Sequence, residues 1–227
     1  MNTRVQYQSM VMAERTFLAD VYGWMTAGLA LTGLVSFELA HSPAFLMPLL
    51  ANKPVFFGLM LLQLVLVVVL SARADRLSPA GATFTFLAYS ALTGVTMSTL
   101  FLTFTSASIA STFFVTAATF GLMSLYGYRS KADLTSVGNI CFMGLVGIIL
   151  ASIVNFFLRS AAVYWITTYL GIFIFVGLTA YDTQKLKDLV VDGSTESQEA
   201  VVGALVLYLD FINLFLQLLN FTGKRRE

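Results

Sequence analysis

Long apolar runs separated by short polar connections fill the chain from residue 17 onwards. A helix needs about 20 mostly apolar residues to cross a bilayer. Seven runs fit this length: Phe17–Ala40, Val55–Ala72, Ala80–Thr105, Ala107–Tyr126, Leu134–Phe157, Ala162–Leu186 and Val201–Phe221. Each is predicted to be helical, because lipid offers no hydrogen-bond partner to free backbone groups. The pattern therefore predicts an all-α, polytopic membrane protein with seven transmembrane helices.

Composition agrees with a chain that is solvated by lipid. Apolar residues make up 58% and charged residues 11% of the sequence, whereas a soluble domain carries about 25% charged residues. We therefore expect a multi-pass protein of the cell membrane, and of the inner membrane if the source is Gram-negative. The net charge of +1 gives no field that would recruit nucleic acid. One cysteine, Cys141, and one histidine, His41, exclude an intrachain disulfide and a Cys- or His-rich metal site.

The chain divides into a polar N-terminal segment (1–16), a seven-helix domain (17–221) and a short basic tail (222–227). The first segment lacks the apolar core and small-residue cleavage site of a signal peptide. With a cytoplasmic N-terminus, inside segments carry eight Lys and Arg residues and outside segments five, as the positive-inside rule favours. The tail would satisfy that rule better if the last segment were re-entrant, but seven full spans are the preferred interpretation.

Two carboxylates, Asp182 and Asp210, lie in the last two apolar runs. An ionised aspartate at mid-bilayer costs about 2.5–3.5 kcal/mol on insertion scales, so each needs a partner, water or a proton. The two runs are consecutive and antiparallel, and the helical rise places both residues at a similar depth toward the cytoplasmic side. Thr179 shares the face of Asp182. A polar stripe on the last run is expected to face inward: Asp210, Asn213, Gln217 and Asn220.

Two carboxylates in contact cannot both ionise easily, so they share one proton. The neutral pair pins two helices together, whereas loss of the proton creates repulsion and a site suited to a hard cation such as Ca²⁺. Asp182 and Asp210 are thus a candidate proton- and calcium-sensitive latch. The alternative is that each aspartate is bonded separately and merely holds helices together. Arg73 and Arg76, after the second run, are candidate partners of the pair or simply a topology signal.

Small residues indicate close helix contacts, because they let backbones approach each other in lipid. The expected contact positions are Gly28, Gly33, Gly94, Ser98, Gly144, Gly147, Gly171 and Gly177. The fourth run begins TSASIASTFFVTAATFG, from Thr105 to Gly121, and is unusually rich in Ser, Thr and Ala. It is either an inner helix of the bundle or a helix with ordinary tight packing.

At these residues the chain resembles the Bax inhibitor-one family, the transmembrane Bax-inhibitor-motif proteins, and especially its bacterial branch. The strongest matches are LTAYDTQKLK from Leu178 to Lys187 and LYLDFINLFLQLL from Leu207 to Leu219. FLADVYGWMTAGLALTG near the start and TFGLMSLYGYRSKADLT in the middle support them. The resemblance covers nearly the whole chain.

The resemblance implies a seven-helix bundle with a central helix surrounded by six, and a pH-sensitive calcium leak channel. It places the family's paired aspartates at Asp182 and Asp210, with no cofactor other than calcium as a permeant or bound ion. It also implies that an arginine after the second helix, Arg73 or Arg76, exchanges with the pair. A glutamate often found in the second helix is replaced by Gln63. Suppression of cell death, the role of eukaryotic relatives, suits a bacterial-like chain poorly.

Two other functions compete with the leak channel. Some bacterial relatives bind a membrane-anchored AAA protease, and the polar N-terminal segment is a candidate contact for such a partner. An intramembrane aspartyl protease would fit Tyr181–Asp182 and a second aspartate, but those enzymes carry glycines around their second aspartate. The context of Asp210 is LYLD, which lacks them, so no enzymatic activity is expected.

Overall fold

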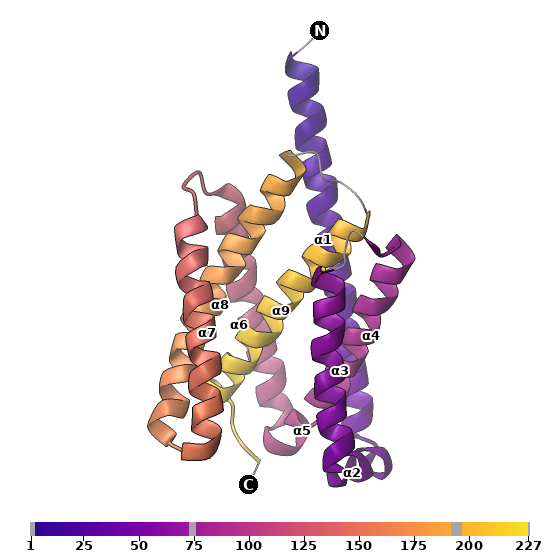
Figure 1. Ribbon diagram of the computed structural model, residues 1–227, viewed down its shortest axis with the longest axis vertical. Helices are drawn as coiled ribbons and strands as arrows, with labels where there is room; N and C mark the ends of the chain where they lie inside the picture. Colours follow the sequence, from indigo (N-terminus) through magenta and orange to yellow (C-terminus); the bar gives the residue numbers. More distant parts are fainter. Residues whose placement is uncertain (1–2, 73–75, 192–196, 227) are drawn as a thin grey trace. The chain divides into compact units, whose positions relative to one another are not determined.

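The computed structural model describes residues 3–72, 76–191 and 197–226. Figure 1 shows the helices that these residues form. They are α1 (Thr3–Ala40), α2 (Pro43–Ala51), α3 (Lys53–Ala72), α4 (Pro79–Met97), α5 (Leu100–Thr103), α6 (Ser106–Arg129), α7 (Thr135–Leu158), α8 (Ala161–Val191) and α9 (Ser197–Thr222).

Seven spans among the described residues are long and apolar enough to cross a membrane, with α4 and α5 together making one of them. The predicted all-α, polytopic class is confirmed. The last span is one continuous helix from Ser197 to Thr222 rather than a re-entrant segment.

Three local features differ from the sequence prediction. The connection after the first run contains a helix, α2, which begins with Pro43 at a position where proline is preset for helical geometry. The third run is interrupted after Met97, where α4 ends before the single turn of α5. The predicted connection 187–200 is shorter, because α8 continues to Val191 and α9 begins at Ser197.

The chain forms two compact units. The first contains residues 1–104, 189–208 and 226–227, and the second contains residues 105–188 and 209–225. α9 contributes residues to both, and 61% of its apolar window is buried, against 33% or less in the other spans. The central position of one helix that the resemblance implies stays a prediction.

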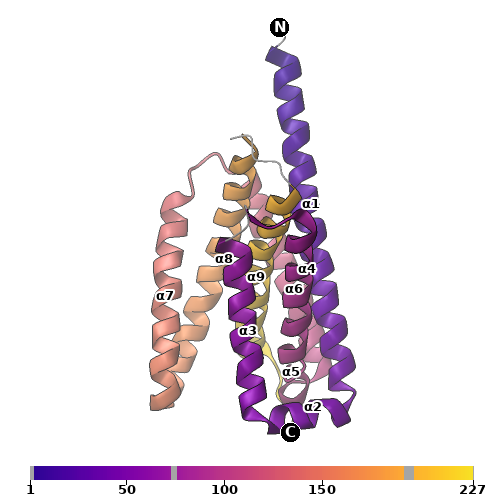
Figure 2. The same cartoon turned by 45° about the vertical axis from the view of Figure 1, so that its right-hand side comes forward.

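Within the first unit, α1 lies along α4 (Figure 2). A Cβ atom at Gly28 would lie 2.5 Å from the Phe86 ring, and one at Gly94 would lie 2.7 Å from the Thr32 carbonyl oxygen. Both glycines therefore allow the close approach predicted from small residues. On α3, Gln63 donates to the Leu92 carbonyl at 3.3 Å, so it packs against α4.

A buried hydrogen-bond chain attaches the first half of α9 to this pair. The Thr32 hydroxyl donates to the Ser90 carbonyl at 2.8 Å and lies 2.6 Å from the Tyr208 hydroxyl. Since Thr32 has only one hydroxyl hydrogen, Tyr208 is the donor in the second bond. Tyr208 is fully buried, with Phe86 and Tyr89 edge-on to its ring. This anchor fixes α9 two residues before Asp210.

Candidate functional site

Asp182 and Asp210 meet inside the second unit. Asp182 lies on α8 and is half-buried, whereas Asp210 lies on α9 and is only 5% exposed. Their carboxyl groups are close enough for a side-chain hydrogen bond between them. Oδ2 of Asp210 is buried and has no hydrogen-bond partner among the described residues. The helical rise predicted a similar depth for these two residues, and in the structure they lie on neighbouring helices of one unit.

The local environment of this pair favours a shared proton. Two carboxylates at hydrogen-bonding distance need a proton between them to attract rather than repel each other. Burial strengthens this requirement, because a low local dielectric amplifies the repulsion of two charges. Among the described residues, Lys185 is the cationic side chain whose charge interacts with Asp182. Lys185 lies three residues further along α8 and is exposed. The arrangement can thus hold a proton, or release it and attract a cation.

Interlocking small residues set the position of α8 against α7. A Cβ atom at Gly138 would lie 2.5 Å from the Tyr181 ring, and one at Gly144 would lie 2.8 Å from Ile174. In the opposite sense, a Cβ atom at Gly177 would lie 2.6 Å from the Cys141 sulfur. Each glycine receives a side chain from the facing helix, so the two helices cannot slide past each other without a clash. Tyr181 is held in this way directly before Asp182.

Gln184 attaches the same end of α8 to the connection between α6 and α7. Its Oε1 accepts the Leu134 backbone N–H at 2.9 Å, and its Nε2 donates to the Ala132 carbonyl at 2.9 Å. One turn further along α8, Lys187 donates to the Tyr128 carbonyl at 3.2 Å and lies over the Tyr128 ring. A cationic side chain on the last carbonyls of α6 is favourable there. These bonds hold the turn of α8 that carries Asp182.

The connection itself is ordered by Asp133. Its Oδ1 accepts the Thr135 backbone N–H at 2.9 Å, which starts α7. The Thr135 hydroxyl and backbone N–H hold the pKa of Asp133 below its ordinary value. Because the folded-state pKa is lowered, the contribution of Asp133 to stability is present at neutral pH. It is lost as the pH falls through the lowered pKa.

Removal of the Gln184 amide is expected to loosen this connection. Gln184→Ala loses two hydrogen bonds, so we expect a loss of about 1–2 kcal/mol in stability, or several degrees in Tm at about 2–4 °C per kcal/mol. Gln184→Glu keeps an acceptor for Leu134 but cannot donate to Ala132, so an intermediate Tm is expected. Thermal unfolding of the purified proteins in detergent measures both. Equal Tm values for Gln184→Ala and the parent protein would contradict the role.

The other predicted site residues have varied surroundings. Thr179 is fully buried and donates to the Phe175 carbonyl at 2.7 Å, so its hydroxyl is used within α8. Asn213 donates to the Leu209 carbonyl at 2.8 Å. Gln217 packs against Gly171, where a Cβ atom would lie 2.8 Å from its amide. Asn213 and Gln217 are half-buried, and the inward orientation of the polar stripe stays a prediction.

The two predicted arginine partners follow the second membrane span, α3. Arg73 lies outside the described residues, and Arg76 is an exposed residue of the first unit. An exchange of either arginine with the aspartate pair stays a prediction. No group of three or more His, Cys, Asp or Glu residues in the described chain could hold a metal ion. Any calcium at Asp182 and Asp210 would therefore take further ligands from amides, carbonyls or water.

Two predicted small-residue contacts are wrong, and two important ones were missed. No atom of the described residues lies within 4 Å of a Cβ atom built at Gly33 or Gly147, so neither glycine serves a helix contact there. Gly127 and Gly138 do, against Ala180 and Tyr181. Gln184 was also missed. The available signal was the pair of matched segments, TFGLMSLYGYRSKADLT and LTAYDTQKLK. The contacts of Gly127 and Gln184 join one segment to the other, whereas Gly138 lies three residues beyond the first segment.

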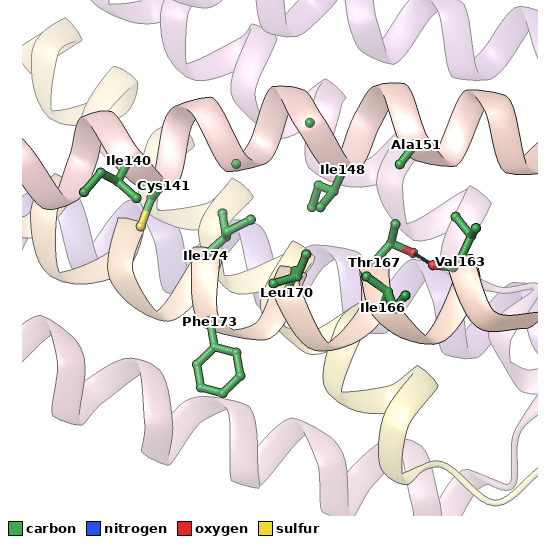
Figure 3. Close-up of a pocket in the computed structure, with 12 residues that line it drawn as sticks. Ile140, Cys141, Ile148, Ala151, Val163, Ile166, Thr167, Leu170, Phe173 and Ile174 are labelled. Atoms are coloured by element: carbon green, nitrogen blue, oxygen red, sulfur yellow. Dashed lines mark hydrogen bonds between the residues drawn. The ribbon is translucent and has the colours of Figure 1, made fainter.

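An apolar cavity lies between α7 and α8, and neither aspartate lines it. Figure 3 shows side chains of α7, including Ile148 and Ala151, and of α8, including Leu170 and Ile174, around this space. Its volume is about 510 Å³, and its lining has no charged residue. The Thr167 hydroxyl points into the helix backbone, donating to the Val163 carbonyl at 2.9 Å. Such a cavity suits lipid chains rather than ions.

Comparison with known proteins identifies relatives over nearly the whole chain. Residues 14–227 match the family described as "Inhibitor of apoptosis-promoting Bax1". The chain is 54% identical over 217 residues to inner membrane protein YbhL of Escherichia coli K12, covering 93% of each chain. It is 44% identical over 214 residues to an uncharacterised protein of Deinococcus radiodurans, covering 93% of this chain and 91% of that one.

Proposed function

Because this chain belongs to the Bax inhibitor-one family of membrane proteins, we propose that it is a pH-sensitive, calcium-permeable leak channel of the inner membrane. Asp182 and Asp210 form the gate. The single observation that carries the proposal is the contact of these two carboxyl groups within the second unit, where one of them is 5% exposed. Intramembrane acids of this kind are functional by default.

The gate works through the charge of the pair. With one proton bound, the carboxyl groups attract each other and hold α8 to α9 in the closed arrangement. Loss of the proton leaves two like charges, which repel by about 4 kcal/mol at 4 Å and an effective dielectric of about 20. That repulsion separates the helices and exposes carboxylate oxygens, the ligands that Ca²⁺ prefers. Flux is therefore expected to increase as the pH rises.

Purified protein in liposomes tests the proposal directly. A calcium indicator inside the vesicles measures influx over a series of pH values with a constant calcium gradient. We expect flux that rises with pH, and no such flux in protein-free liposomes or in liposomes with an unrelated seven-helix protein. Absence of flux at every pH would sink the channel hypothesis.

A second candidate function is binding to a membrane-anchored AAA protease and modulation of its activity. One observation favours it: α1 begins at Thr3, ahead of its membrane span, which begins at Val11. Figures 1 and 2 show this end of α1 extending beyond α3 and α4 of the same unit. A helix that continues out of the membrane offers a surface to a partner at the bilayer face.

Affinity capture from native membranes tests this second function. If the N-terminal helix is the contact, deletion of residues 1–15 is expected to remove a co-purifying protease. Residues 16–40 stay long enough to cross the membrane. A deletion of residues 223–227, at the other chain end, serves as the control and should leave capture unchanged. Equal capture by both deletions would rule out the N-terminal contact.

A further inference from the structure

The buried face of α6 carries hydroxyl groups at helical spacing. Four residues at steps of four or eight share this face: Ser108, Thr112, Thr116 and Ser124. Each is 8% exposed or less. Phe120, 4% exposed, occupies the remaining step between Thr116 and Ser124. The other side of α6 is apolar and open to lipid, with Phe114 71% exposed and Leu122 68% exposed.

Two buried oxygens of the second unit lack hydrogen-bond partners, and one of them belongs to the last hydroxyl of this face. In the part of the chain that the structure describes, they are Oγ of Ser124 and Oδ2 of Asp210. Ser124 is 6% exposed and Asp210 is 5% exposed, so protein surrounds both. A buried polar atom without a partner costs free energy, and each such atom calls for water or an ion. The proton gate formed by Asp182 and Asp210 gives neither oxygen a hydrogen-bond partner.

An aromatic ring, that of Phe120, lies between Ser124 and the other hydroxyl residues along α6. The centroids of Phe120 and Phe211 lie 5.5 Å apart, and those of Phe113 and Phe211 lie 5.4 Å apart. Phe120 precedes Ser124 by one turn of α6, and Phe211 follows Asp210 on α9. At the other end, the Thr112 and Thr222 hydroxyl oxygens lie 3.4 Å apart. α9 therefore runs along the hydroxyl face of α6. The Phe120 and Phe211 rings meet at the point where Ser124 is parted from the other hydroxyl residues of that face.

We propose that this face of α6 lines the route by which water and cations reach Asp182 and Asp210, and that Phe120 and Phe211 close it. The inference rests on the proposed leak function and adds the lining and the constriction. Hydroxyl oxygens replace part of the hydration shell of a hard cation. An apolar constriction stops ions by excluding water until the rings separate. Ser108 ends the route, where its Oγ accepts the Lys224 backbone N–H at 2.9 Å.

Cysteine accessibility tests the lining independently of flux. In a Cys141→Ala background, which removes the only native thiol, Thr112→Cys, Thr116→Cys and Ser124→Cys are exposed to a cationic methanethiosulfonate reagent in liposomes. Flux is measured on the same samples at high and low pH. Arg225→Cys, on the exposed tail, reports how pH alone changes the reagent. Phe114→Cys, facing lipid, is the matched control on α6.

The rate at Arg225→Cys is used to correct for the effect of pH on the reagent. After this correction, we expect Ser124→Cys to react roughly tenfold faster at the pH of high flux, because the rate of modification follows the fraction of open channels. Phe114→Cys should stay unreactive at both pH values. Flux with no reaction at any of the three cysteines would overturn the route and leave the leak function standing. Absence of flux in the background protein and in the parent would remove the leak function and the route with it.

The constriction has its own test. Phe120→Ala removes a ring from the contact with Phe211, so flux is expected to persist at the pH that closes the parent protein. Phe120→Leu keeps an apolar side chain for folding and should leak less than Phe120→Ala. Phe114→Ala changes the same residue type on the lipid side and should gate normally. Normal closure by the folded Phe120→Ala and Phe120→Leu proteins would overturn the role of the rings.

Discussion

Replacement of Asp210 by asparagine is expected to abolish the rise of calcium flux with pH. An amide does not lose a proton at any pH of the assay. The introduced amide therefore stays a hydrogen-bond partner of Asp182, and the two side chains never carry two like charges. The helices then stay together at every pH. A reduction of roughly tenfold or more at high pH is expected, since each factor of ten in an opening equilibrium takes only about 1.4 kcal/mol.

Asp182→Asn should remove the pH response as well, but for a different reason. It leaves Asp210, the more buried carboxyl group at 5% exposure, to keep its proton in the low-dielectric interior. Asp188→Asn is the matched control, because Asp188 lies on the same helix and is exposed. The liposome assay across the pH series compares the three variants with the parent. An unchanged flux profile in both Asp182→Asn and Asp210→Asn would show that the pair is only structural.

Gly127→Ala is expected to be the most destabilising methyl addition in the second unit. A Cβ atom at Gly127 would overlap the carbonyl oxygen of Ala180, a backbone atom that no side-chain rotation can move. α6 and α8 must separate to admit it. Overpacking of this kind costs about 1–3 kcal/mol, which lowers Tm by several degrees at about 2–4 °C per kcal/mol.

Gly121→Ala provides the control on the same helix. Nothing lies within 4 Å of a Cβ atom at Gly121, so the change brings only the helix-propensity gain of alanine, up to about 1 kcal/mol. Thermal unfolding in detergent should therefore move in opposite directions for the two variants. Since Ala180 lies two residues before Asp182, Gly127→Ala should also disturb the closed state and raise flux at low pH. Equal Tm values for the two variants would contradict the close backbone contact.

Periodicity and hydropathy were sufficient for the spans and for one contact between distant parts of the chain. Lipid forces an apolar run of this length to become a helix, so the runs predict α3, α6, α7, α8 and α9 within five residues at each end. They also predict α1 and α4, but α1 begins 14 residues before its run and α4 ends eight residues before the end of its run. Consecutive spans are antiparallel, and a fixed helical rise then brings Asp182 and Asp210 to one depth. That the two carboxyl groups also face each other was a hypothesis, based on the need of a buried carboxylate for a partner or a proton. The structure places both residues in the second unit.

Other features depended on which helix faces which, and that information is absent from any single run. Gly33 and Gly147 have the same local signal as Gly94, yet only Gly94 meets a neighbour. Gln184 looks like an ordinary polar residue at a helix end until the connection 130–134 lies against it.

The sequence by itself determined that the chain crosses the membrane and that two acids lie within its last spans, because the bilayer acts on each run separately. Only the tertiary structure decided which backbones touch and which oxygens stay without partners. It also decided which aromatic rings come between them. The physical reason is that packing depends on pairs of helix surfaces. The contacts of one surface cannot be known until the surface that faces it is known.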